Sequence, residues 1–433
     1  MISKPTPLDE PAGILATDST ESTSTATPLA LVGAGVVGRA ILDQCIRHGL
    51  QVWLLDVDAA ALQRAAATVR ANEPGISITP LPDPIEGVQA LRFCDRSNSP
   101  VSGPPRLVIE SIAENLAAKR AFFTAAAAIW GRDCILATNT SNLRVAEIFD
   151  ALPDHPHCLG MHFFMPVAWR PLVELIPRES TAPAALRACR DWAARLGKRT
   201  LVTGDHPGFV VNRLLAPYLN QSLLLLGRGA TATTLQAAAR EFGMPISPLE
   251  LIDRIGIRTA FDSGRVFWRA FPKRIDPAPI LPGMIKANRL GTAAGGGFFE
   301  PLLGEPAAES TGPLHPRAQE VIARYARDPR AWSTAEVIEN LAIPMWIEAS
   351  QILADRVVGS VDEIELAVAG GLGFQGGFFR FFESLGSRRL REVLASAGNT
   401  PALAAPDRLI EALVSAPSPV SASLRYAGLE PDA

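Results

Sequence analysis

The sequence predicts an α/β fold with an open, mostly parallel, doubly wound sheet, followed by an all-α region of two related helical domains. Apolar strand-like segments alternate with segments of helical periodicity from Pro28 to about residue 205. A glycine-rich turn joins the first of these strands to the first helix. Beyond residue 205 the strand signals fade and helical spacing dominates, which separates the two regions.

The elements of the first region follow one another at short intervals. Residues 29–38 begin as an apolar strand and end in the glycine-rich turn. Residues 71–105 have little periodicity and many Pro and Gly residues, so we interpret them as irregular. The other elements are predicted as strands within 51–56, 106–111, 134–141, 158–166 and 172–177, and as helices over 39–49 and 114–130.

Similar segments indicate that the helical region is duplicated. Residues 212–226 align on Pro217 with residues 340–353 on Pro344, which lies 127 positions later. Two further pairs of similar segments are 229–243 with 359–373 and 249–256 with 379–386. We therefore predict a disordered tail at 1–27, an α/β domain at 28–205, a first helical domain at 206–300, a linker at 301–333 and a second helical copy at 334–433.

The composition excludes several classes of function. The chain has 433 residues and a net charge of −3, so we expect no nucleic-acid partner. No segment is apolar over the length that a membrane span requires. Five cysteines, an odd number without a C-x-x-C pair, predict neither a disulfide framework nor a metal site. The Ser/Thr/Pro-rich residues 1–27 resemble no targeting signal, and we expect a cytoplasmic protein.

The glycine-rich turn has the pattern of a dinucleotide site. Its residues are Gly33, Gly35, Val36, Val37 and Gly38, in the order G-x-G-x-x-G. The glycines permit a tight turn and the close approach of a pyrophosphate, and the following helix supplies free N–H groups. Asp56, at the end of the next strand, can accept hydrogen bonds from ribose hydroxyls and repels a 2′-phosphate, which favours NAD over NADP. A glycine turn without a ligand is the alternative.

His162 and Glu174 are candidates for acid–base chemistry. His162 lies in the apolar run GMHFFMP, and Glu174 lies in the apolar strand segment PLVELIP. A carboxylate is costly to bury without a partner, so the two residues on adjacent strands form a plausible pair. The carboxylate would fix the imidazole tautomer and stabilise the imidazolium. A structural pair of core residues is the alternative.

Two further polar residues complete the candidate site. Ser141 lies in ATNTSNL, directly after an apolar strand, where ligands bind in open α/β sheets. It could hydrogen-bond a substrate oxygen, or belong to an ordinary helix start. Asn212 opens the first helix of the helical region and could reach back into the cleft between the domains.

These motifs resemble those of the 3-hydroxyacyl-CoA dehydrogenases of fatty-acid β-oxidation. The resemblance is strongest to the dehydrogenase half of the bacterial multifunctional α-subunit, without its hydratase/isomerase domain. It covers roughly residues 28 to 415 and rests on GAGVVG, ESIAENLAAK, ATNTSNL, GMHFFMPV, LVELI, HPGFVVNRLLAPY and GLGFQGG. It implies a Rossmann-type NAD-binding domain and the NAD-dependent oxidation of a (3S)-3-hydroxyacyl-CoA to the 3-ketoacyl-CoA.

The resemblance also implies roles for individual residues. His162 is the general base, Glu174 is its partner, and Ser141 and Asn212 hold the reacting oxygen. Glu114 and Lys119 contact the cofactor on the nicotinamide side, and Ser141 is also a cofactor-side residue. The implied partner is an acyl-CoA substrate. The chain would be a monomer with an internal pseudo-dimer or a homodimer, and a thiolase or hydratase partner follows by analogy.

Several positions depart from the family pattern. Met165 stands where the family has asparagine, and Asn142 stands where it has serine. Ser247 replaces the glycine of the family's G-P pair, residues 289–300 lack a family lysine, and residues 59–91 contain no lysine. In the family, a basic helical hairpin in that last segment helps to hold coenzyme A. The departures favour two alternatives: a dehydrogenase for another 3-hydroxy acid or unusual acyl-CoA, and a non-catalytic NAD- or acyl-CoA-binding homologue.

Overall fold

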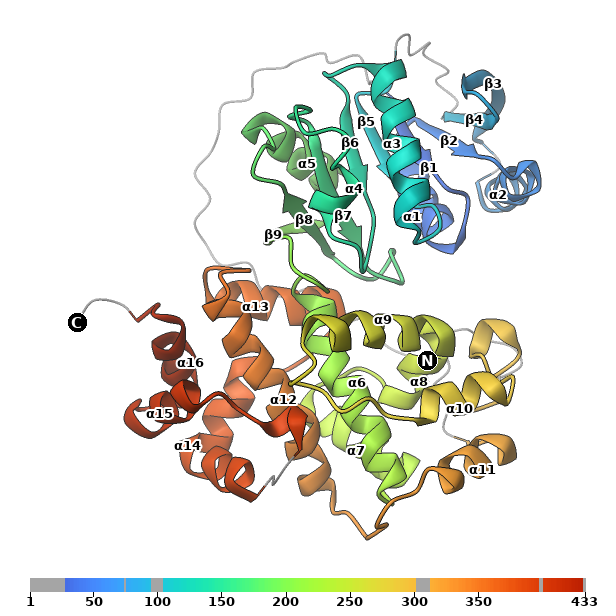
Figure 1. Cartoon of the computed structure of the whole chain (residues 1–433). Coiled ribbons are helices and arrows are strands. Elements are labelled where there is room, and N and C mark those ends of the chain that lie inside the picture. Colours follow the sequence, from blue (N-terminus) through green and yellow to red (C-terminus); the bar gives the residue numbers. More distant parts are fainter. Residues whose placement is uncertain (1–27, 74, 95–103, 301–311, 397–399, 431–433) are drawn as a thin grey trace.

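The protein has an α/β domain followed by a helical body, which lie one above the other in Figure 1. The computed structural model describes residues 28–73, 75–94, 104–300, 312–396 and 400–430. The disordered tail expected at 1–27 lies outside the described residues. Among those that are described, every helix falls short of the length or the apolar character that crossing a membrane requires.

The sheet of the α/β domain has a parallel centre and antiparallel flanks. Its strands in the described residues are β1 (Leu29–Val32), β2 (Val52–Asp56), β3 (Ser77–Ile85), β4 (Val88–Cys94), β5 (Leu107–Glu110), β6 (Ile135–Thr138), β7 (Cys158–Phe163), β8 (Leu172–Pro177) and β9 (Arg199–Val202). Their order is β3-β4-β2-β1-β5-β6-β7-β8-β9. The run from β2 to β7 is parallel, whereas β4 runs antiparallel to β2, and β8 antiparallel to β7. This confirms the predicted α/β fold class.

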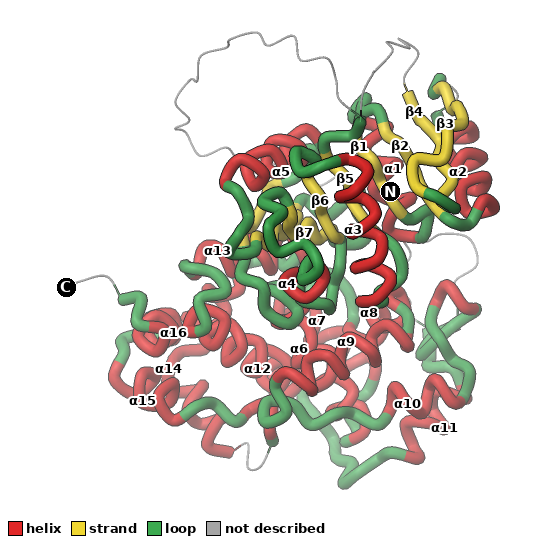
Figure 2. Tube along the Cα trace, turned by 45° about the horizontal axis from the view of Figure 1, so that its top comes forward, coloured by secondary structure: helices red, strands yellow, loops and turns green. Residues whose placement is uncertain are grey.

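Helices cover both faces of the sheet (Figure 2). They are α1 (Val36–Arg47), α2 (Ala59–Asn72), α3 (Leu116–Trp130), the short α4 (Val145–Ile148) and α5 (Pro183–Arg195). Alternate residues of β1 point to opposite faces: Leu29 and Leu31 pack in one core with α1, α2 and α5, and Ala30 and Val32 pack in the other with α3 and α4. Because both faces are covered, the central strands are mostly apolar, and the polar residues Glu110 and Thr138 stand at the carboxyl ends of β5 and β6.

The interpretation of residues 71–105 as irregular was wrong for the part that forms β3 and β4. These two strands form an antiparallel hairpin that extends the sheet beyond β2. Proline occupies positions 80, 82 and 84 of β3, and this spacing resembles a loop in the sequence. β3 is the edge strand, where a missing N–H costs no ladder hydrogen bond, so proline is tolerated there and blocks further strand pairing.

The helical body is built around two long helices. Its elements are α6 (Val211–Gly227), α7 (Ala232–Phe242), α8 (Pro248–Ile255), α9 (Ile257–Ala270), α10 (Ile280–Lys286), α11 (Pro316–Arg324), α12 (Thr334–Ala354), α13 (Val361–Ala367), a π-helical turn (Val368–Leu372), α14 (Phe378–Ser396), α15 (Asp407–Ser415) and α16 (Pro419–Ala427). α6 and α12 lie against each other, and one hydrophobic core contains residues from both predicted copies. The two predicted helical copies therefore pack on each other through a shared core.

Part of the segment predicted as a linker is helical. Residues 316–324 form α11, which begins with Pro316 and is capped by the His315 side chain. Its buried residues Ala318 and Val321 join the core of the helical body. The linker interpretation followed the Pro-rich composition and overlooked that proline is favoured at the first position of a helix.

The two halves of the helical body share local features. α6 and α12 each contain an internal proline, Pro217 and Pro344. Gly256 ends α8 and Gly386 interrupts α14, and both have positive φ angles, of 95° and 78°. These parallels agree with the aligned segments, and the duplication itself stays a prediction.

Candidate active site

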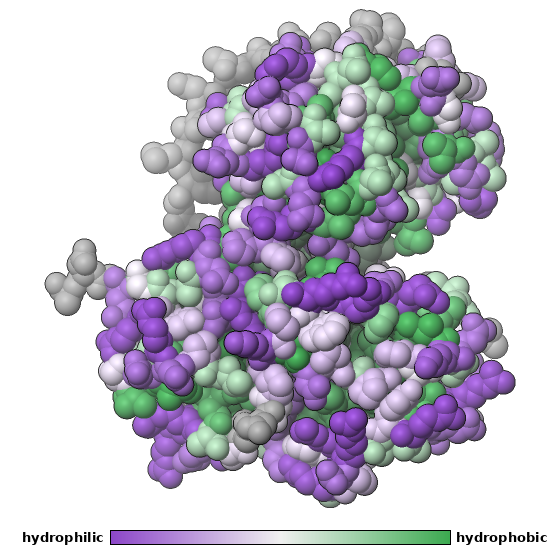
Figure 3. Space-filling model, viewed as in Figure 1, coloured by the Kyte–Doolittle hydropathy of each residue, from purple (hydrophilic) through white to green (hydrophobic). Residues whose placement is uncertain are grey.

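The predicted site residues gather at one edge of the sheet. The glycine turn follows β1, Asp56 ends β2, Ser141 follows β6, and His162 lies near the end of β7. All these strands are parallel, so their carboxyl ends meet at the edge that faces the helical body. Figure 3 shows a notch between the two lobes at this level. α6, which starts with Val211 and Asn212, lies beneath this edge.

The glycines of the turn differ in the space around them. A Cβ atom on Gly33 would lie 2.5 Å from the carbonyl oxygen of Ser111, and one on Gly38 would lie 1.8 Å from that of Gly33. Packing therefore requires both of these glycines. A Cβ on Gly35 would meet no atom within 4 Å, so that glycine faces open space. The start of α1 has no side-chain cap, and its N–H groups are suited to an anion.

Asp56 is held beside the glycine turn. Its Oδ2 accepts a hydrogen bond of 2.6 Å from the N–H of Ala34, and its Oδ1 accepts one of 2.9 Å from the N–H of Asp58. The side chain remains half-buried, so the carboxylate keeps lone pairs for further donors. A fixed carboxylate next to the turn fits the two hydroxyls of an unphosphorylated ribose, as in NAD.

His162 and Glu174 form a buried pair. The register of β7 and β8 places them directly opposite each other, and His162 Nδ1 lies 2.9 Å from Glu174 Oε2. His162 is 3 % exposed and Glu174 is fully buried. A carboxylate only accepts hydrogen bonds, so Nδ1 carries the proton, and Nε2 of the neutral ring carries the free lone pair. The rings of Phe164 and Phe209 pack on the imidazole at 4.6 and 5.7 Å.

The start of α6 fixes the other oxygen of Glu174. Its Oε1 accepts hydrogen bonds of 3.1 Å from the N–H groups of Val210 and Val211. α6 has no side-chain cap from its own N-cap residue, so Glu174 serves as the cap from the neighbouring domain. The positive end of the helix dipole also favours the carboxylate. One glutamate therefore connects the imidazole to the first turn of α6.

Ser141 and Asn212 meet between the two domains. The Asn212 side-chain amide donates a hydrogen bond of 3.4 Å to the Ser141 carbonyl oxygen. Both residues are half-buried. Asn212 directly follows Val211, whose N–H binds Glu174, so the structure brings the four residues predicted for catalysis to the start of α6.

Glu114 anchors the loop that carries Ser141. Its Oε1 accepts hydrogen bonds from the Thr140 hydroxyl at 2.6 Å and from the N–H groups of Ser141 and Asn142 at 3.0 Å. Burial of the carboxylate acts to raise its pKa, but the Lys119 ammonium and the hydrogen bonds from the loop outweigh burial, so the pKa of Glu114 lies below its ordinary value. Glu114 therefore stays ionised and keeps the loop in place.

Lys119 is an internal residue of the site. It is 1 % exposed, and its ammonium lies 2.5 Å from Glu110 Oε1 and 3.3 Å from Glu114 Oε2. Glu110 was not among the predicted site residues; it is fully buried in β5 and also accepts a hydrogen bond from the Thr138 hydroxyl at 2.7 Å. An acid in the apolar segment RLVIES was the available signal. That Lys119 contacts the cofactor stays a prediction, and its present contacts are these two carboxylates.

The positions that depart from the family pattern lie in both domains. The Met165 side chain is 44 % exposed, in the loop that follows β7. Ser247 is buried at the N-terminus of α8, and its hydroxyl has no hydrogen-bond partner within the described residues. Arg289 is buried in the segment that lacks the lysine and donates to the carbonyl oxygens of Gly297 and Phe299. Arg289 therefore serves the fold of that segment.

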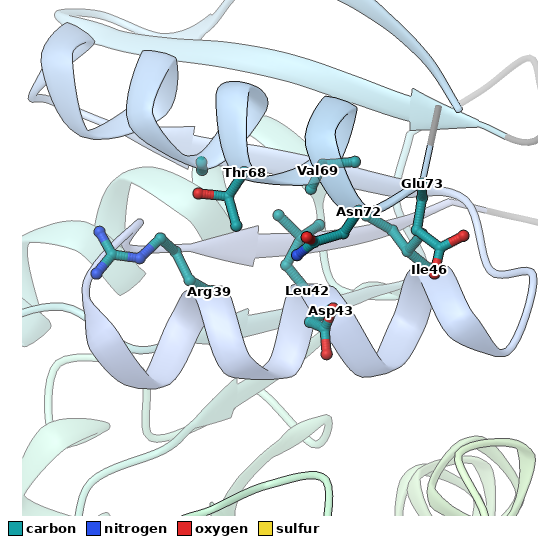
Figure 4. A pocket seen from close by; sticks show the side chains of 9 residues that line it. Arg39, Leu42, Asp43, Ile46, Thr68, Val69, Asn72 and Glu73 are labelled. Atoms are coloured by element: carbon teal, nitrogen blue, oxygen red, sulfur yellow. The ribbon is translucent and has the colours of Figure 1, made fainter. Parts of the chain in front are cut away.

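A small cavity between α1 and α2 is separate from this site (Figure 4). Its volume is about 60 Å³, and its lining includes Arg39, Leu42, Thr68 and Asn72. Small-molecule sites usually have volumes of about 300 Å³ or more, so a dinucleotide does not fit there. The cavity reflects loose packing between two helices on one face of the sheet.

Comparison with known proteins identifies relatives of both regions. Residues 28–206 match the NAD-binding domain of 3-hydroxyacyl-CoA dehydrogenase, and residues 208–301 match the C-terminal domain of that family. The crystal structure of (S)-3-hydroxybutyryl-CoA dehydrogenase PaaH1 from Ralstonia eutropha is 28% identical, with a TM-score of 0.53, and the match covers 64% of this chain and 99% of that one.

Two longer structures match both halves of the helical body. The 3-hydroxybutyryl-CoA dehydrogenase of Escherichia coli K12 is 21% identical, with a TM-score of 0.68, over 87% of this chain and 96% of that one. The dehydrogenase part of multifunctional enzyme 1 from C. elegans is 21% identical, with a TM-score of 0.58, over 88% of each chain. At this identity the two structures establish a shared fold that includes the C-terminal region.

Proposed function

The chain belongs to the 3-hydroxyacyl-CoA dehydrogenase family and is an NAD-dependent oxidoreductase, and from this premise we propose that it oxidises a (3S)-3-hydroxyacyl-CoA to the 3-ketoacyl-CoA. The observation that carries the proposal is the buried His162–Glu174 pair, with a distance of 2.9 Å between Nδ1 and Oε2. The pair lies at the start of α6, next to Asn212 and Ser141.

In this proposal His162 is the general base. Glu174 accepts a hydrogen bond from the Nδ1–H group, which leaves the lone pair of Nε2 free to take the proton from the 3-hydroxyl group. A bound NAD⁺ would supply the hydride acceptor for C3 of the substrate. Glu174 keeps the ring oriented and stabilises its protonated form, and the two N–H groups of α6 keep Glu174 in place.

Ser141 and Asn212 hold the reacting oxygen. The Asn212 amide and the Ser141 hydroxyl are donors on either side of the boundary between the domains. Donors fixed before the reaction stabilise charge that develops on the oxygen, because they need not reorganise during the step. Closure of the two domains over the substrate would exclude water from the path of the hydride.

A related substrate is the second candidate. The segment that follows Asp56 contains α2 and the β3–β4 hairpin, and residues 59–91 include only Arg64 and Arg70 as basic residues. Few cations in this segment weaken the case for a coenzyme A thioester as the carrier. This observation favours a free 3-hydroxy acid or an unusual acyl thioester as the alternative substrate.

The test is turnover of defined substrates with NAD⁺. We expect the purified protein to form NADH with (3S)-3-hydroxybutyryl-CoA or a longer homologue and to leave the (3R) enantiomer unchanged. NADH formation with free 3-hydroxybutyrate, and not with the thioesters, would move the assignment to the second candidate. No turnover of either class would contradict the proposed reaction.

Assembly and location are parts of the same proposal. A monomer with an internal pseudo-dimer is supported by the single core that joins α6 and α12, with a homodimer as the alternative. A sedimentation measurement distinguishes the two. All five cysteines are free and buried, which supports action in the reducing cytoplasm. A thiolase or hydratase partner would supply or consume the acyl-CoA.

A further inference from the structure

Two glycines of the C-terminal region press against the neighbours of Glu174. Gly370 and Gly371 lie in the π-helical turn Val368–Leu372, which follows α13. A Cβ atom on Gly370 would lie 2.8 Å from Cβ of Leu172, and one on Gly371 would lie 2.7 Å from Cγ2 of Val211. Neither glycine has room for a side chain, so the backbone of the turn packs directly against Leu172 of β8 and Val211 of α6.

Leu172 and Val211 are both connected to Glu174. Leu172 is two residues before Glu174 in β8, and the N–H of Val211 donates to Glu174 Oε1 at 3.1 Å. Val211 is β-branched and lies in the first turn of a helix, so it cannot move aside by simple rotation. A displacement of Val211 would therefore move the N–H groups that hold the carboxylate.

The same C-terminal region ties α6 at a second point. Arg213, two residues after Val211, is fully buried and pairs with Glu348 of α12 and, at 2.6 Å, with Asp355. Arg213 also lies over the ring of Phe271, at 4.8 Å. The first turn of α6 is thus fixed both by the ion pairs of Arg213 and by the contact of Val211 with the π-helical turn.

We propose that the π-helical turn at 368–372 is a positioning element of the active site: it sets the place of β8 and of the first turn of α6, and through them the Glu174 carboxylate against His162. Gly371 is the residue on which this depends most, and Gly370 acts from the side of β8. π-Helical turns are uncommon and occur often at functional sites. The family matches end at residue 301, before this turn.

The test compares a variant that introduces a steric clash with a double variant that removes it. In Gly371→Ala the new Cβ meets Val211, whereas in Gly371→Ala/Val211→Ala the nearest contact becomes Cβ of residue 211, at 3.3 Å. Gly370→Ala presses on Leu172 at its Cβ, so Val211→Ala cannot relieve it. Gly264→Ala is the control, because a Cβ in that part of α9 meets no atom within 4 Å. Val211→Ala alone gives the baseline for the double variant.

Two readouts separate positioning from general packing. The first is kcat and KM for the reaction proposed above, on which this readout rests. The second needs no substrate: the proton NMR resonance of the His162 Nδ1–H hydrogen bond in protein carrying isotope-labelled histidine, assigned with His162→Gln. The unfolding temperature is measured for each variant. If the wild-type protein oxidises no 3-hydroxyacyl-CoA, the proposed function fails while the resonance still tests the positioning.

We expect that Val211→Ala rescues Gly371→Ala and does not rescue Gly370→Ala. Gly371→Ala lowers kcat about 10- to 100-fold, as a small misplacement of catalytic groups does, leaves KM for NAD⁺ within about two-fold and shifts or broadens the resonance. Adding Val211→Ala restores both readouts to the Val211→Ala baseline, and it restores neither in Gly370→Ala. A folded Gly371→Ala protein with unchanged kcat and resonance would overturn the proposal, as would a loss of kcat with the resonance intact. Gly370→Ala provides the same two readouts if Gly371→Ala does not fold.

Discussion

The two central helices, α6 and α12, differ most at their first turns. α12 begins with a capping box, in which the Ser333 and Glu336 side chains satisfy each other's backbone N–H groups. α6 has no side-chain cap from its N-cap residue, and its N–H groups bind Glu174 of the other domain instead. The helix start that lacks its own cap is therefore the one available for the site.

The aligned positions on the two helices carry different chemistry. When Pro217 is placed on Pro344 without a gap, Asn212 in α6 falls on Glu339 in α12, one residue before the similar segment 340–353. The Asn212 amide reaches Ser141, whereas both oxygens of Glu339 are paired with Arg389, at 2.6 and 2.9 Å. The first helical region thus contributes the Asn212 amide to the site, whereas Glu339 of the second region forms an ion pair within that region.

The largest expected effect on stability concerns the contact between the two helices. Glu348→Gln leaves Arg213 buried with only Asp355 as a direct carboxylate partner, and we expect a loss of about 3 kcal/mol in the free energy of unfolding. Glu339→Gln, in the same helix, disrupts a pair whose arginine is half-exposed and should cost less than about 1 kcal/mol. Chemical denaturation measures both, and equal losses would contradict an anchoring role for α12.

Glu174→Gln should reduce kcat about 100-fold, because it removes the charge that stabilises the imidazolium while an acceptor oxygen remains for α6. The second region offers a matched control. Glu365 accepts hydrogen bonds of 2.9 and 2.6 Å from the N–H groups of Phe378 and Phe379 at the start of α14. Glu365→Gln should leave kcat within about two-fold. Similar losses in both variants would show that Glu174 acts only as a cap.

Asn212→Ala should lower kcat about 10- to 100-fold with a small change in the unfolding temperature, because it removes one donor to the reacting oxygen. Glu339→Ala, at the aligned position, should leave kcat unchanged. Steady-state kinetics and thermal unfolding of both variants test the contrast. An Asn212→Ala enzyme with normal kcat would remove Asn212 from the site.

The smallest expected effect is in the pH dependence of stability. The pKa of Glu114 lies below its ordinary value, so its stabilising contribution is present at neutral pH and is lost as the pH falls through the lowered pKa. Glu114→Gln should therefore reduce the difference in unfolding temperature between neutral and acidic pH. Glu336 provides the control. The hydrogen bond from the backbone N–H of Ser333 is the largest of the causes that lower the pKa of Glu336 to about 2. Glu336→Gln should narrow the same difference and leave kcat unchanged.

Local pattern was sufficient to predict much of the fold. Apolar runs, the glycine turn and Asp56 predicted the parallel centre of the sheet and its first helix, because each element has its own periodicity. The β3–β4 hairpin was missed because prolines 80, 82 and 84 favour a loop unless the strand is known to lie at an edge. α11 was missed because Pro316 resembled a linker residue instead of a helix start.

The contact between His162 and Glu174 could be predicted, because the two residues lie on strands that follow each other in the sequence. The sequence placed His162 and Glu174 on adjacent strands, and the register pairs them directly. The contacts of Lys119 with Glu110 and of Gly371 with Val211 could not be predicted, because they depend on how separate elements pack in three dimensions. No spacing rule connects residues that are 160 positions apart.

The most direct test of the central claim is the reduction of acetoacetyl-CoA by NADH, followed by the loss of nicotinamide absorbance, in the wild-type protein and in His162→Ala. We predict turnover by the wild-type protein and a loss of roughly 1,000-fold in the variant, within the range for removal of a general acid–base group. His157→Ala should retain activity, because His157 directly precedes β7, whereas His162 lies near the carboxyl end of that strand. Turnover by His162→Ala within a few-fold of wild type would show that His162 is a core histidine and would contradict the proposed mechanism.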